Sequence, residues 1–402
     1  MKTCLPEPVV DAARTVVDWC RYESVRREVV SVARYCESTG GGSCRVTDGE
    51  RMSPVCSPLY YPARERKRAE VPMPPAYCAR LHDATLIGES DAVLAGGYIV
   101  YDAPETDNVN FTDCAFLDRR KIYRIEGKTK AYFARSRARR VGQAVSLVGN
   151  YSWNYYHWVL EFMAKLWLLS RCDIPRQVPL AVDACVRAVP QFMTYLEAFG
   201  GGRPLIFVRR RERLCVGELY LLSAVNVIPP NFIDTSRIEG HDILFDMRSV
   251  DFIRERMSDY SRRQLAGERR EYPGRVFISR KGNRNRSYNE PEVERAVLRH
   301  GFRPVMPQHY SVAEQIELFA GADFIVAASG AALTNIIYCK RGCKVAVLTS
   351  QEVELSIFSS IADHLGVEMI YLAGKSDSDN NIQTGFEIDP AEIERLLSEY
   401  CN

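Results

Sequence analysis

The most constraining feature of this chain is the regular alternation of short apolar segments with amphipathic segments between residues 275 and 372. The apolar segments are typical of strands, and the segments between them are typical of helices. Strands and helices that alternate at this spacing form right-handed crossovers and a parallel sheet. The predicted strands lie at 275–280, 303–306, 323–328, 344–348 and 368–372, and the predicted helices lie near 289–300, 311–321, 333–339, 353–366 and 390–400.

The loop after the first of these strands is rich in cations. It contains Arg280, Lys281, Arg284, Arg286 and Asn289. A guanidinium holds a phosphate bidentately, so this loop is a candidate phosphate site. Asn289 is expected to cap the helix that follows. The alternative is a solvated basic turn, which fits Lys281 and Arg284 better than Arg280, because Arg280 stands at the end of the strand.

A second loop, after the strand at 323–328, has the composition of an anion-binding turn. It contains Ser329, Gly330, Ala331, Thr334 and Asn335. Small residues let a ligand approach the backbone, and the N–H groups and dipole at a helix start favour a phosphate. The alternative is a tight turn whose side chains cap the helix. Two such loops at the carboxyl ends of strands predict a nucleotide-diphosphate pocket.

The segment from Asn150 to Glu161 follows a predicted strand at 143–148 and opens a helix expected from Asn154 to about Arg171. His157 and Glu161 are four residues apart and so share one face of that helix. A carboxylate beside an imidazole fixes its tautomer or raises its basicity, and either group can act as a general base. The alternative is a helix start in which His157 bonds to the backbone and Trp158 fills the core.

The remaining pattern divides the chain into three regions. Residues 1–75 are predicted to be a partly helical N-terminal extension, residues 76–245 an α/β domain, and residues 246–402 a Rossmann-like domain. The middle region has strand patterns near 84–88, 92–94, 98–101, 143–148, 178–182, 205–208 and 218–227. A charged helical segment from Ile243 to Gly267 is expected to link the two domains.

Within the first region, Asp11–Tyr35 has the pattern of one or two amphipathic helices. The Gly-rich run at 38–43 is expected to be a turn or linker, since a phosphate loop should follow a strand. Residues 64–75 are charged and then rich in proline, which predicts an exposed connection.

Composition excludes several classes of protein. The net charge of +2 and pI of about 7.9 give no global field for nucleic acid. The thirteen cysteines show no repeated spacing, and Cys339 and Cys343 lack a second ligand pair for zinc. We expect reduced thiols, a cytoplasmic chain without a signal peptide, and no membrane span. Peripheral attachment at the inner face of the membrane, through a partner or a lipid-linked substrate, and the oligomeric state stay open.

One further motif has the spacing of a metal site. Asp377 and Asp379 form an Asp-x-Asp pair, which can hold a divalent cation on a sugar diphosphate. The pair lies in a polar run at 376–381 that is typical of a loop, so we expect no bound metal.

Three ordered motifs resemble glycosyltransferase family 61, and the bacterial members annotated for capsular polysaccharide biosynthesis look closest. These motifs are Asn-Tyr-Tyr-His-Trp-x-x-Glu, Ile-Ser-Arg-Lys with Arg-x-x-Asn-Glu, and Ala-Asp-Phe-Ile-Val with Gly-Ala-x-Leu-Thr-Asn. The resemblance covers roughly residues 77–375. It implies a GT-B-like α/β architecture, with two facing Rossmann-like domains and a cleft between them.

The resemblance also implies a reaction. An inverting enzyme of this kind moves a hexosyl or pentosyl group from a nucleotide-diphosphate sugar to a glycan hydroxyl, without a bound metal or other cofactor. By this resemblance, His157 and Glu161 lie at the catalytic centre. Nucleotide-sugar contacts are expected from Arg280, Lys281, Arg286, Asn289, Ser329, Gly330, Ala331, Leu333, Thr334 and Asn335.

Two positions depart from the family pattern, and two other functions remain. Ser329 stands where the family usually has His, and Ala332 where it usually has Gly. A serine donates a hydrogen bond but carries no positive charge, which keeps open a non-catalytic relative that binds a sugar or a partner. A dinucleotide-dependent oxidoreductase is a weaker alternative, because no predicted strand is followed by Gly-x-Gly-x-x-Gly.

Overall fold

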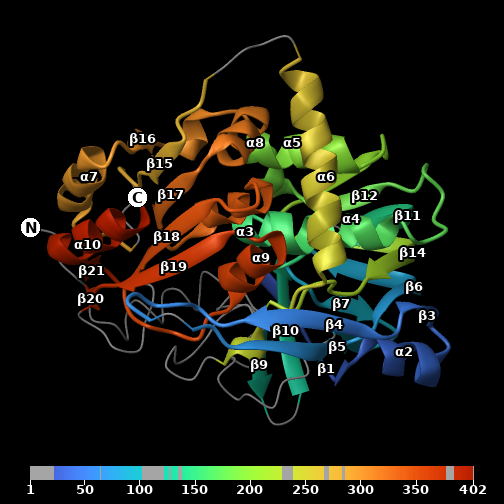
Figure 1. Cartoon of the computed structure of the whole chain (residues 1–402). Coiled ribbons are helices and arrows are strands. Elements are labelled where there is room, and N and C mark those ends of the chain that lie inside the picture. The colour runs from blue at the N-terminus through green and yellow to red at the C-terminus, as the bar shows by residue number, and fades with distance from the viewer. Residues whose placement is uncertain are drawn as a thin grey trace, which may run out of the picture.

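The computed structural model describes residues 22–63, 65–101, 122–125, 128–134, 138–228, 239–266, 271–282, 286–376 and 384–401. Three sets of predictions lie outside the described residues: those for Arg284, for Asp377 and Asp379, and for the part of the predicted N-terminal helix before residue 22. The described chain forms two lobes, each built on one large sheet (Figure 1).

The sheet of the second lobe is parallel, with the strand order β16-β15-β17-β18-β19. Its strands are β15 (Arg275–Ile278), β16 (Arg303–Val305), β17 (Phe324–Ala328), β18 (Lys344–Thr349) and β19 (Glu368–Ala373). These confirm the five strands that the alternation predicts, with small shifts at their ends. Every residue of β17 is buried, as expected for a strand covered on both faces.

Helices connect these strands as predicted. They are α7 (Glu290–Arg299), α8 (Val312–Gly321), η6 (Ala331–Tyr338), α9 (Ile357–Leu365) and α10 (Pro390–Tyr400), with a short 3₁₀ turn η5 (Pro307–His309) before α8 and a two-stranded ribbon of β20 (Lys375–Ser376) and β21 (Phe386–Glu387) before α10. Ser311 and Glu314 form a reciprocal capping box that fixes the start of α8. The helix predicted near 333–339 is the 3₁₀-helix η6, which begins two residues earlier.

The first lobe has a mixed sheet. The nine described strands of this sheet run in the order β13-β12-β11-β14-β6-β7-β8-β2, with β3 paired to β6. The members after residue 75 are β6 (Ala76–Ile87), β7 (Val93–Ala95), β8 (Tyr98–Val100), β11 (Arg139–Leu147), β12 (Leu180–Asp183), β13 (Leu205–Val208) and β14 (Arg213–Leu222). The first four strands in this order are mutually parallel, and β6 joins them antiparallel.

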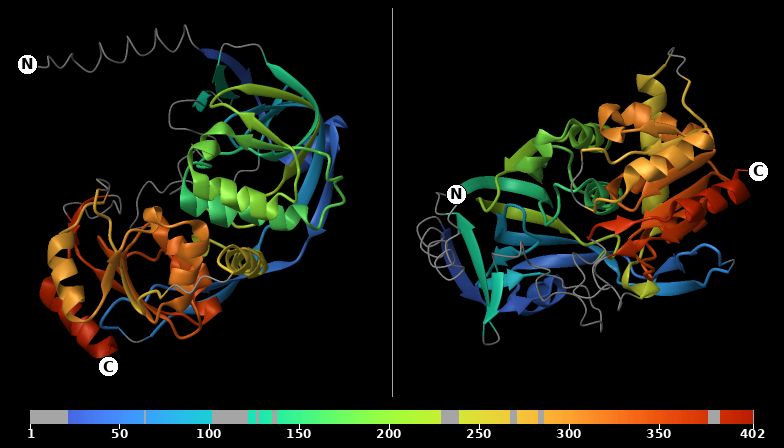
Figure 2. Two further views of the ribbon diagram at one scale, coloured as in Figure 1. Left: turned by 90° about the horizontal axis from the view of Figure 1, so that it is seen from above. Right: turned by 90° about the vertical axis from the view of Figure 1, so that its left-hand side faces the viewer.

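Helical segments follow β11 and β12 on the side that faces the second lobe (Figure 2). After β11 come α3 (Tyr155–His157), the π-helix η1 (Trp158–Phe162) and α4 (Met163–Leu169); after β12 come η2 (Ala184–Ala188) and α5 (Pro190–Phe199). A short turn, η4 (Gly240–Asp242), then precedes α6 (Met247–Gln264). Helix α6 packs against α4 and α5 of the first lobe and against α8 and η6 of the second.

The prediction of helix over Asp11–Tyr35 is wrong for residues 22–30. These residues form β1 (Tyr22–Arg27) and β2 (Val29–Val30), and only α2 (Val32–Thr39) is helical. Strand β1 joins β10 (Lys128–Ala134) and β9 (Ile122–Ile125) in a small sheet, and β2 pairs with β8. The β-branched Val25, Val29 and Val30 favour extended backbone once a partner strand is available.

The Gly-rich run at 38–43 is not a linker between domains. Gly40 adopts the left-handed conformation that ends α2, with φ 62°, and β3 (Gly42–Asp48) begins at once. A Cβ at Gly42 would stand 2.2 Å from the carbonyl oxygen of Arg80 on the paired strand. The glycines therefore make a tight helix-to-strand turn inside the first lobe.

The next segment crosses from the first lobe to the second (Figure 2). It forms the hairpin β4 (Arg51–Cys56) and β5 (Arg68–Met73), so the exposed connection expected at 64–75 is in part a strand. The backbone of Cys56 bonds to the hydroxyls of Ser359 and Ser360 in α9, at 2.6 and 3.0 Å. The hairpin of β4 and β5 thus connects the first lobe to α9 of the second.

Both sheets have a point at which the strand order reverses. Numbered along the chain, the parallel part of the first sheet has the order 3-2-1-4 and the second sheet has the order 2-1-3-4-5. Ligands of α/β proteins bind outside the carboxyl ends of the strands at such points. The relevant loops follow β11 and β14 in the first lobe, and β15 and β17 in the second.

One hydrophobic core runs through both lobes. It includes Leu147 and Trp158 in the first lobe, Ile253 in α6, and Ile325 and Leu333 in the second, all nearly inaccessible to solvent. Two further clusters fill the outer faces of the two sheets. Because the central core is continuous, moving the lobes apart would expose apolar surface.

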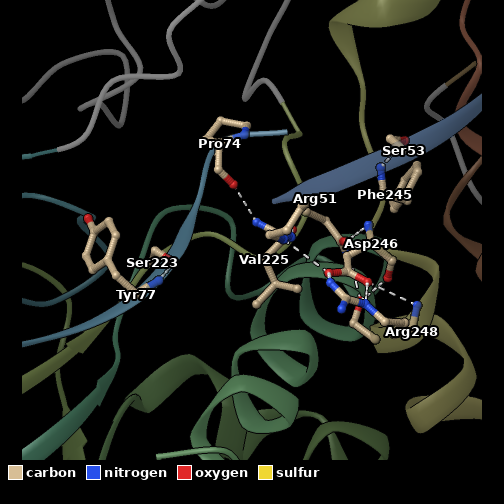
Figure 3. Close-up of polar contacts among 11 residues, drawn as sticks. Arg51, Ser53, Pro74, Tyr77, Ser223, Val225, Phe245, Asp246 and Arg248 are labelled. Atoms are coloured by element: carbon tan, nitrogen blue, oxygen red, sulfur yellow. Dashed lines mark hydrogen bonds and ion pairs between the residues drawn. The ribbon is translucent and has the colours of Figure 1, made fainter. Parts of the chain in front are cut away.

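A buried ion pair anchors the start of α6 (Figure 3). Arg51 Nε lies 3.1 Å from Asp246 Oδ2, and both side chains are almost fully buried. The same guanidinium donates to the carbonyl oxygens of Pro74 and Val225. Burial alone would raise the pKa of Asp246, but hydrogen bonds from Arg248 and the charge of Arg51 outweigh it and hold that pKa below its ordinary value.

We expect Arg51→Leu to destabilise the protein by about 3–5 kcal/mol, because it removes one of the two cations that pair with the buried Asp246 carboxylate and the donor to the buried Val225 carbonyl. Urea unfolding followed by circular dichroism measures the loss. The matched control is Arg295→Ala, which removes an exposed pair with Glu292 and should cost less than about 1 kcal/mol. Equal unfolding midpoints for the two variants would contradict the anchoring role.

Candidate functional site

His157 and Glu161 lie at the start of the helix that follows β11. Asn154 caps this helix by accepting a hydrogen bond from the Tyr156 backbone at 3.0 Å. His157 Nδ1 stands 2.7 Å from Glu161 Oε2. The imidazole is largely buried and the carboxylate is partly exposed. Glu161 thus fixes the orientation of the ring and leaves Nε2 as the second nitrogen for chemistry.

The turn between these two residues is a π-helix, which the sequence did not indicate. The Met163 backbone N–H bonds to the carbonyl of Trp158, one residue further back than in an α-helix. Asn226, in the loop after β14, donates Nδ2 to the Leu160 carbonyl at 2.5 Å, and its own oxygen accepts from the Asp246 backbone at 2.9 Å. Because the Asn226 side chain bonds to a backbone carbonyl within this turn, the turn is wider than in an α-helix.

Trp158 is fully buried against Phe162 and Phe192. The part of the alternative interpretation that put Trp158 in the core therefore agrees with the structure. The other part does not, since His157 is paired with a carboxylate and not with the backbone.

Two carboxyls brace the loop that leads from β11 to this helix. Asp183 accepts the backbone N–H of Glu89 at 2.7 Å and that of Gly149 at 3.0 Å, one on each oxygen. Asp91 accepts the N–H of Asn150 at 3.2 Å. A Cβ at Gly149 would stand 2.4 Å from Asp91 Oδ1, so a glycine is needed for this close approach.

These two carboxyls titrate unusually. Burial raises the pKa of Asp183 to about 7, against the hydrogen bonds that it accepts. Burial also raises the pKa of Asp91 to about 6; the charge of Lys165 lowers it and that of Glu161 raises it. Asp91 thus lies within electrostatic reach of the His157–Glu161 pair. Sequence reasoning missed it, and the Gly149-Asn150 step after a strand was the only signal that pointed to a close neighbour.

In the second lobe, the structure brings Arg280 and Arg286 together on the turn after β17. Their Nη1 atoms lie 3.2 and 3.3 Å from the carbonyl oxygen of Ser329. Burial and then the charge of Arg280 lower the pKa of Arg286 to about 10, and burial lowers that of Arg280. Arg286 also has a φ of 53°, a strained conformation for a residue with a side chain. Two crowded, partly buried cations of this kind favour an anion.

Two other candidates on this loop are engaged elsewhere. Lys281 is exposed and pairs with Glu294, whose hydrogen bond raises the pKa of the lysine. Asn289 precedes α7 but makes no side-chain cap; instead it exchanges two hydrogen bonds with the Ile388 backbone, at 2.8 and 2.9 Å. Neither contact is directed at Ser329.

Glu290, which the sequence analysis did not single out, supports the arginine loop. Its Oε1 accepts from the Ser279 hydroxyl at 2.5 Å and from the Arg280 backbone at 2.9 Å.

The turn at 329–335 divides into an open start and a buried end. Ser329, Gly330 and Ala331 are partly exposed, whereas Leu333, Thr334 and Asn335 are buried. Thr334 Oγ1 has no hydrogen-bond partner among the described residues. The buried residues therefore belong to the packing between the lobes, and the start of the turn carries the arginine contacts.

Asn335 joins the two lobes. Its oxygen accepts from the Tyr155 hydroxyl at 2.6 Å, and its nitrogen donates to Gln315 at 3.0 Å. Tyr155 stands two positions before His157, so the imidazole helix starts beside η6. A 3₁₀-helix rises about 2 Å per residue, so Gly330 lies roughly 10 Å along η6 from Asn335.

Within the described residues, no group of three or more His, Cys, Asp and Glu side chains is placed to hold a metal ion. In the same part of the chain, no helix combines the length and the apolar character that a membrane crossing requires.

A comparison with models of protein families gives a match. A family model described as Glycosyltransferase 61 matches residues 155–346. The matched range begins at the imidazole helix and includes both loops around Ser329. It supports the assignment to glycosyltransferase family 61 and a glycosyltransferase activity. No curated protein matches the chain.

The raised pKa values of Asp91 and Asp183 predict a dependence of stability on pH. Each folded pKa exceeds the ordinary value of 3.8. The stabilising contribution of the neutral carboxyls is fully present below pH 3.8 and is lost as pH rises to about 6 or 7. We therefore expect Asp91→Asn to be more stable than the wild type at pH 8 and similar to it near pH 4.

Urea unfolding from pH 4 to pH 8 tests this expectation. The control is Asp173→Asn, because the Asp173 side chain is exposed. A variant Asp91→Asn that is less stable than the wild type at pH 8 would contradict the assignment of a strained, buried charge.

Proposed function

We propose that this chain is an inverting, metal-independent glycosyltransferase. It moves a hexosyl or pentosyl group from a nucleotide-diphosphate sugar to a hydroxyl of a glycan. One observation carries the proposal: the family match includes two helix starts, each beside the point at which the order of parallel strands reverses, and the Tyr155–Asn335 hydrogen bond links them. A GT-B-like arrangement, in which two Rossmann-like domains face each other, is part of the same proposal.

In this proposal, His157 is the general base. Glu161 holds Nδ1, so Nε2 accepts the proton of the acceptor hydroxyl as its oxygen attacks the anomeric carbon. The carboxylate then stabilises the imidazolium. The reverse assignment, with Glu161 as base and His157 as its orienting partner, uses the same contact.

Charge on the leaving diphosphate is compensated by Arg280 and Arg286 in this proposal. The Ser329 carbonyl aligns both guanidinium groups on the start of the Gly330 turn. Preorganised cations of this kind stabilise charge that develops in the transition state. The contact uses the backbone of Ser329, so the family's usual histidine is not required for it.

The finer points of the proposal rest on the motif resemblance. They are the relationship to enzymes of bacterial capsular polysaccharide synthesis and a cytoplasmic location at the inner face of the membrane. A non-catalytic sugar-binding relative is the second candidate, since the serine at position 329 supplies no charge of its own.

Nucleotide binding tests the arginine assignment. We expect a nucleoside diphosphate, screened among uridine, guanosine, cytidine, adenosine and thymidine diphosphates, to raise the melting temperature of the wild type. Arg286→Ala should abolish the rise, whereas the surface variant Arg295→Ala should keep it. The same rise in Arg286→Ala and wild type would reject the clamp.

Turnover tests the base. His157→Ala and Glu161→Gln should each lower the rate of sugar transfer by about 10²–10⁴-fold. The double variant should lose little more, because the two residues act as one unit. Nucleotide-induced thermal shifts should persist in all three. Wild-type rates from both single variants would refute the assignment.

A further inference from the structure

Tyr151, in the loop before the imidazole helix, has an unfavourable backbone conformation. Its φ is 61°, in the left-handed region where a bulky side chain is strained. Its carbonyl accepts the Asn154 backbone N–H at 2.8 Å and so closes the turn. Glycine or asparagine would make this turn at lower cost. A tyrosine here indicates that the ring itself is used.

The ring of Tyr151 stacks on the imidazole of His157. The ring centroids are 4.9 Å apart and the planes are inclined by 20°. The ring of Tyr151 also contacts that of Trp153, with the ring centroids 5.9 Å apart and the planes inclined by 49°. The rings of His157, Tyr151 and Trp153 therefore form a row in which each ring contacts the next.

Trp153 is exposed at the outer end of this row. Its exposed fraction is 55%, whereas Trp158 and Trp167 are buried in the core. An exposed indole contributes little to folding, because a tryptophan stabilises by burying its large apolar surface. The exposed indole, in contact with the ring that stacks on His157, is therefore available to a ligand.

We propose that Tyr151 and Trp153 form a subsite that binds the C–H face of a pyranose ring. A pyranose has one apolar face of C–H groups and carries hydroxyls at its rim, so it stacks on an aromatic ring and leaves its hydroxyls at the edge. Stacking beside His157 brings a rim hydroxyl to the imidazole. The acceptor is accordingly a sugar, and not a serine or threonine of a protein; this role as acceptor rests on the proposed function.

The indole itself reports on the subsite. Trp153 emission is obtained as the difference between the fluorescence of the wild type and that of Trp153→Phe, which keeps an aromatic ring. The probes are cellotriose, maltotriose, chitotriose and xylotriose. The controls are sorbitol, which has hydroxyls but no ring, and a peptide rich in serine and threonine.

We expect at least one trisaccharide to change the Trp153 emission saturably, and neither control to do so. Isothermal titration with that trisaccharide should give binding about tenfold weaker in Trp153→Ala than in wild type, and an intermediate value in Trp153→Phe. The melting temperature should be the same in all three proteins, since the side chain is exposed. No response to any trisaccharide, or an equal response to the peptide, would overturn the proposal.

This experiment needs neither donor nor turnover, so its failure differs from a failure of the proposed function. Trisaccharide binding without nucleotide binding would reject the transferase and keep the subsite. Nucleotide binding without any trisaccharide response would reject the subsite and keep the transferase.

Discussion

The hydrogen bond from Tyr155 to Asn335 is the contact on which the site depends. It is partly buried, it joins the first lobe to the second, and each partner stands within a few residues of a candidate functional group. Tyr155 shares a helix start with His157, and Asn335 shares η6 with the turn at Gly330. The continuous core around it resists separation of the lobes. The contact therefore ties the helix start that carries His157 to η6, which follows the turn that the arginine pair contacts.

The region around this contact carries strain that the rest of the protein offsets. Tyr151 and Arg286 have positive φ values, and Asp91 has a pKa raised by burial. Each of these features by itself makes folding less favourable. Strained backbone and shifted pKa values cluster at sites where a protein positions groups for chemistry. The π-helix at Trp158–Phe162 belongs to the same pattern, since Asn226 must supply the hydrogen bond that the widened turn lacks.

The sequence predicted what depends on local pattern and missed what depends on distant partners. The second lobe's strands and helices follow from periodicity, and the spacing of His157 and Glu161 foretold their contact. The local pattern predicts helix at Val29–Val30, where the structure has a strand, because the partner strand β8 lies far along the chain. Asp91 and Asn226 were missed for the same reason. The position and residue type of Asn289 predict a helix cap. Its side chain instead bonds to the backbone of Ile388, 99 residues further along the chain.

The most direct test of this account is a crystal structure of the protein with a bound nucleoside diphosphate. We predict that Arg280 and Arg286 contact its phosphates at the start of the Gly330 turn, and that the sugar end of a nucleotide-sugar bound in the same place points toward His157. A nucleotide bound elsewhere, or phosphates that contact neither arginine, would contradict the claim that both lobes contribute to one site.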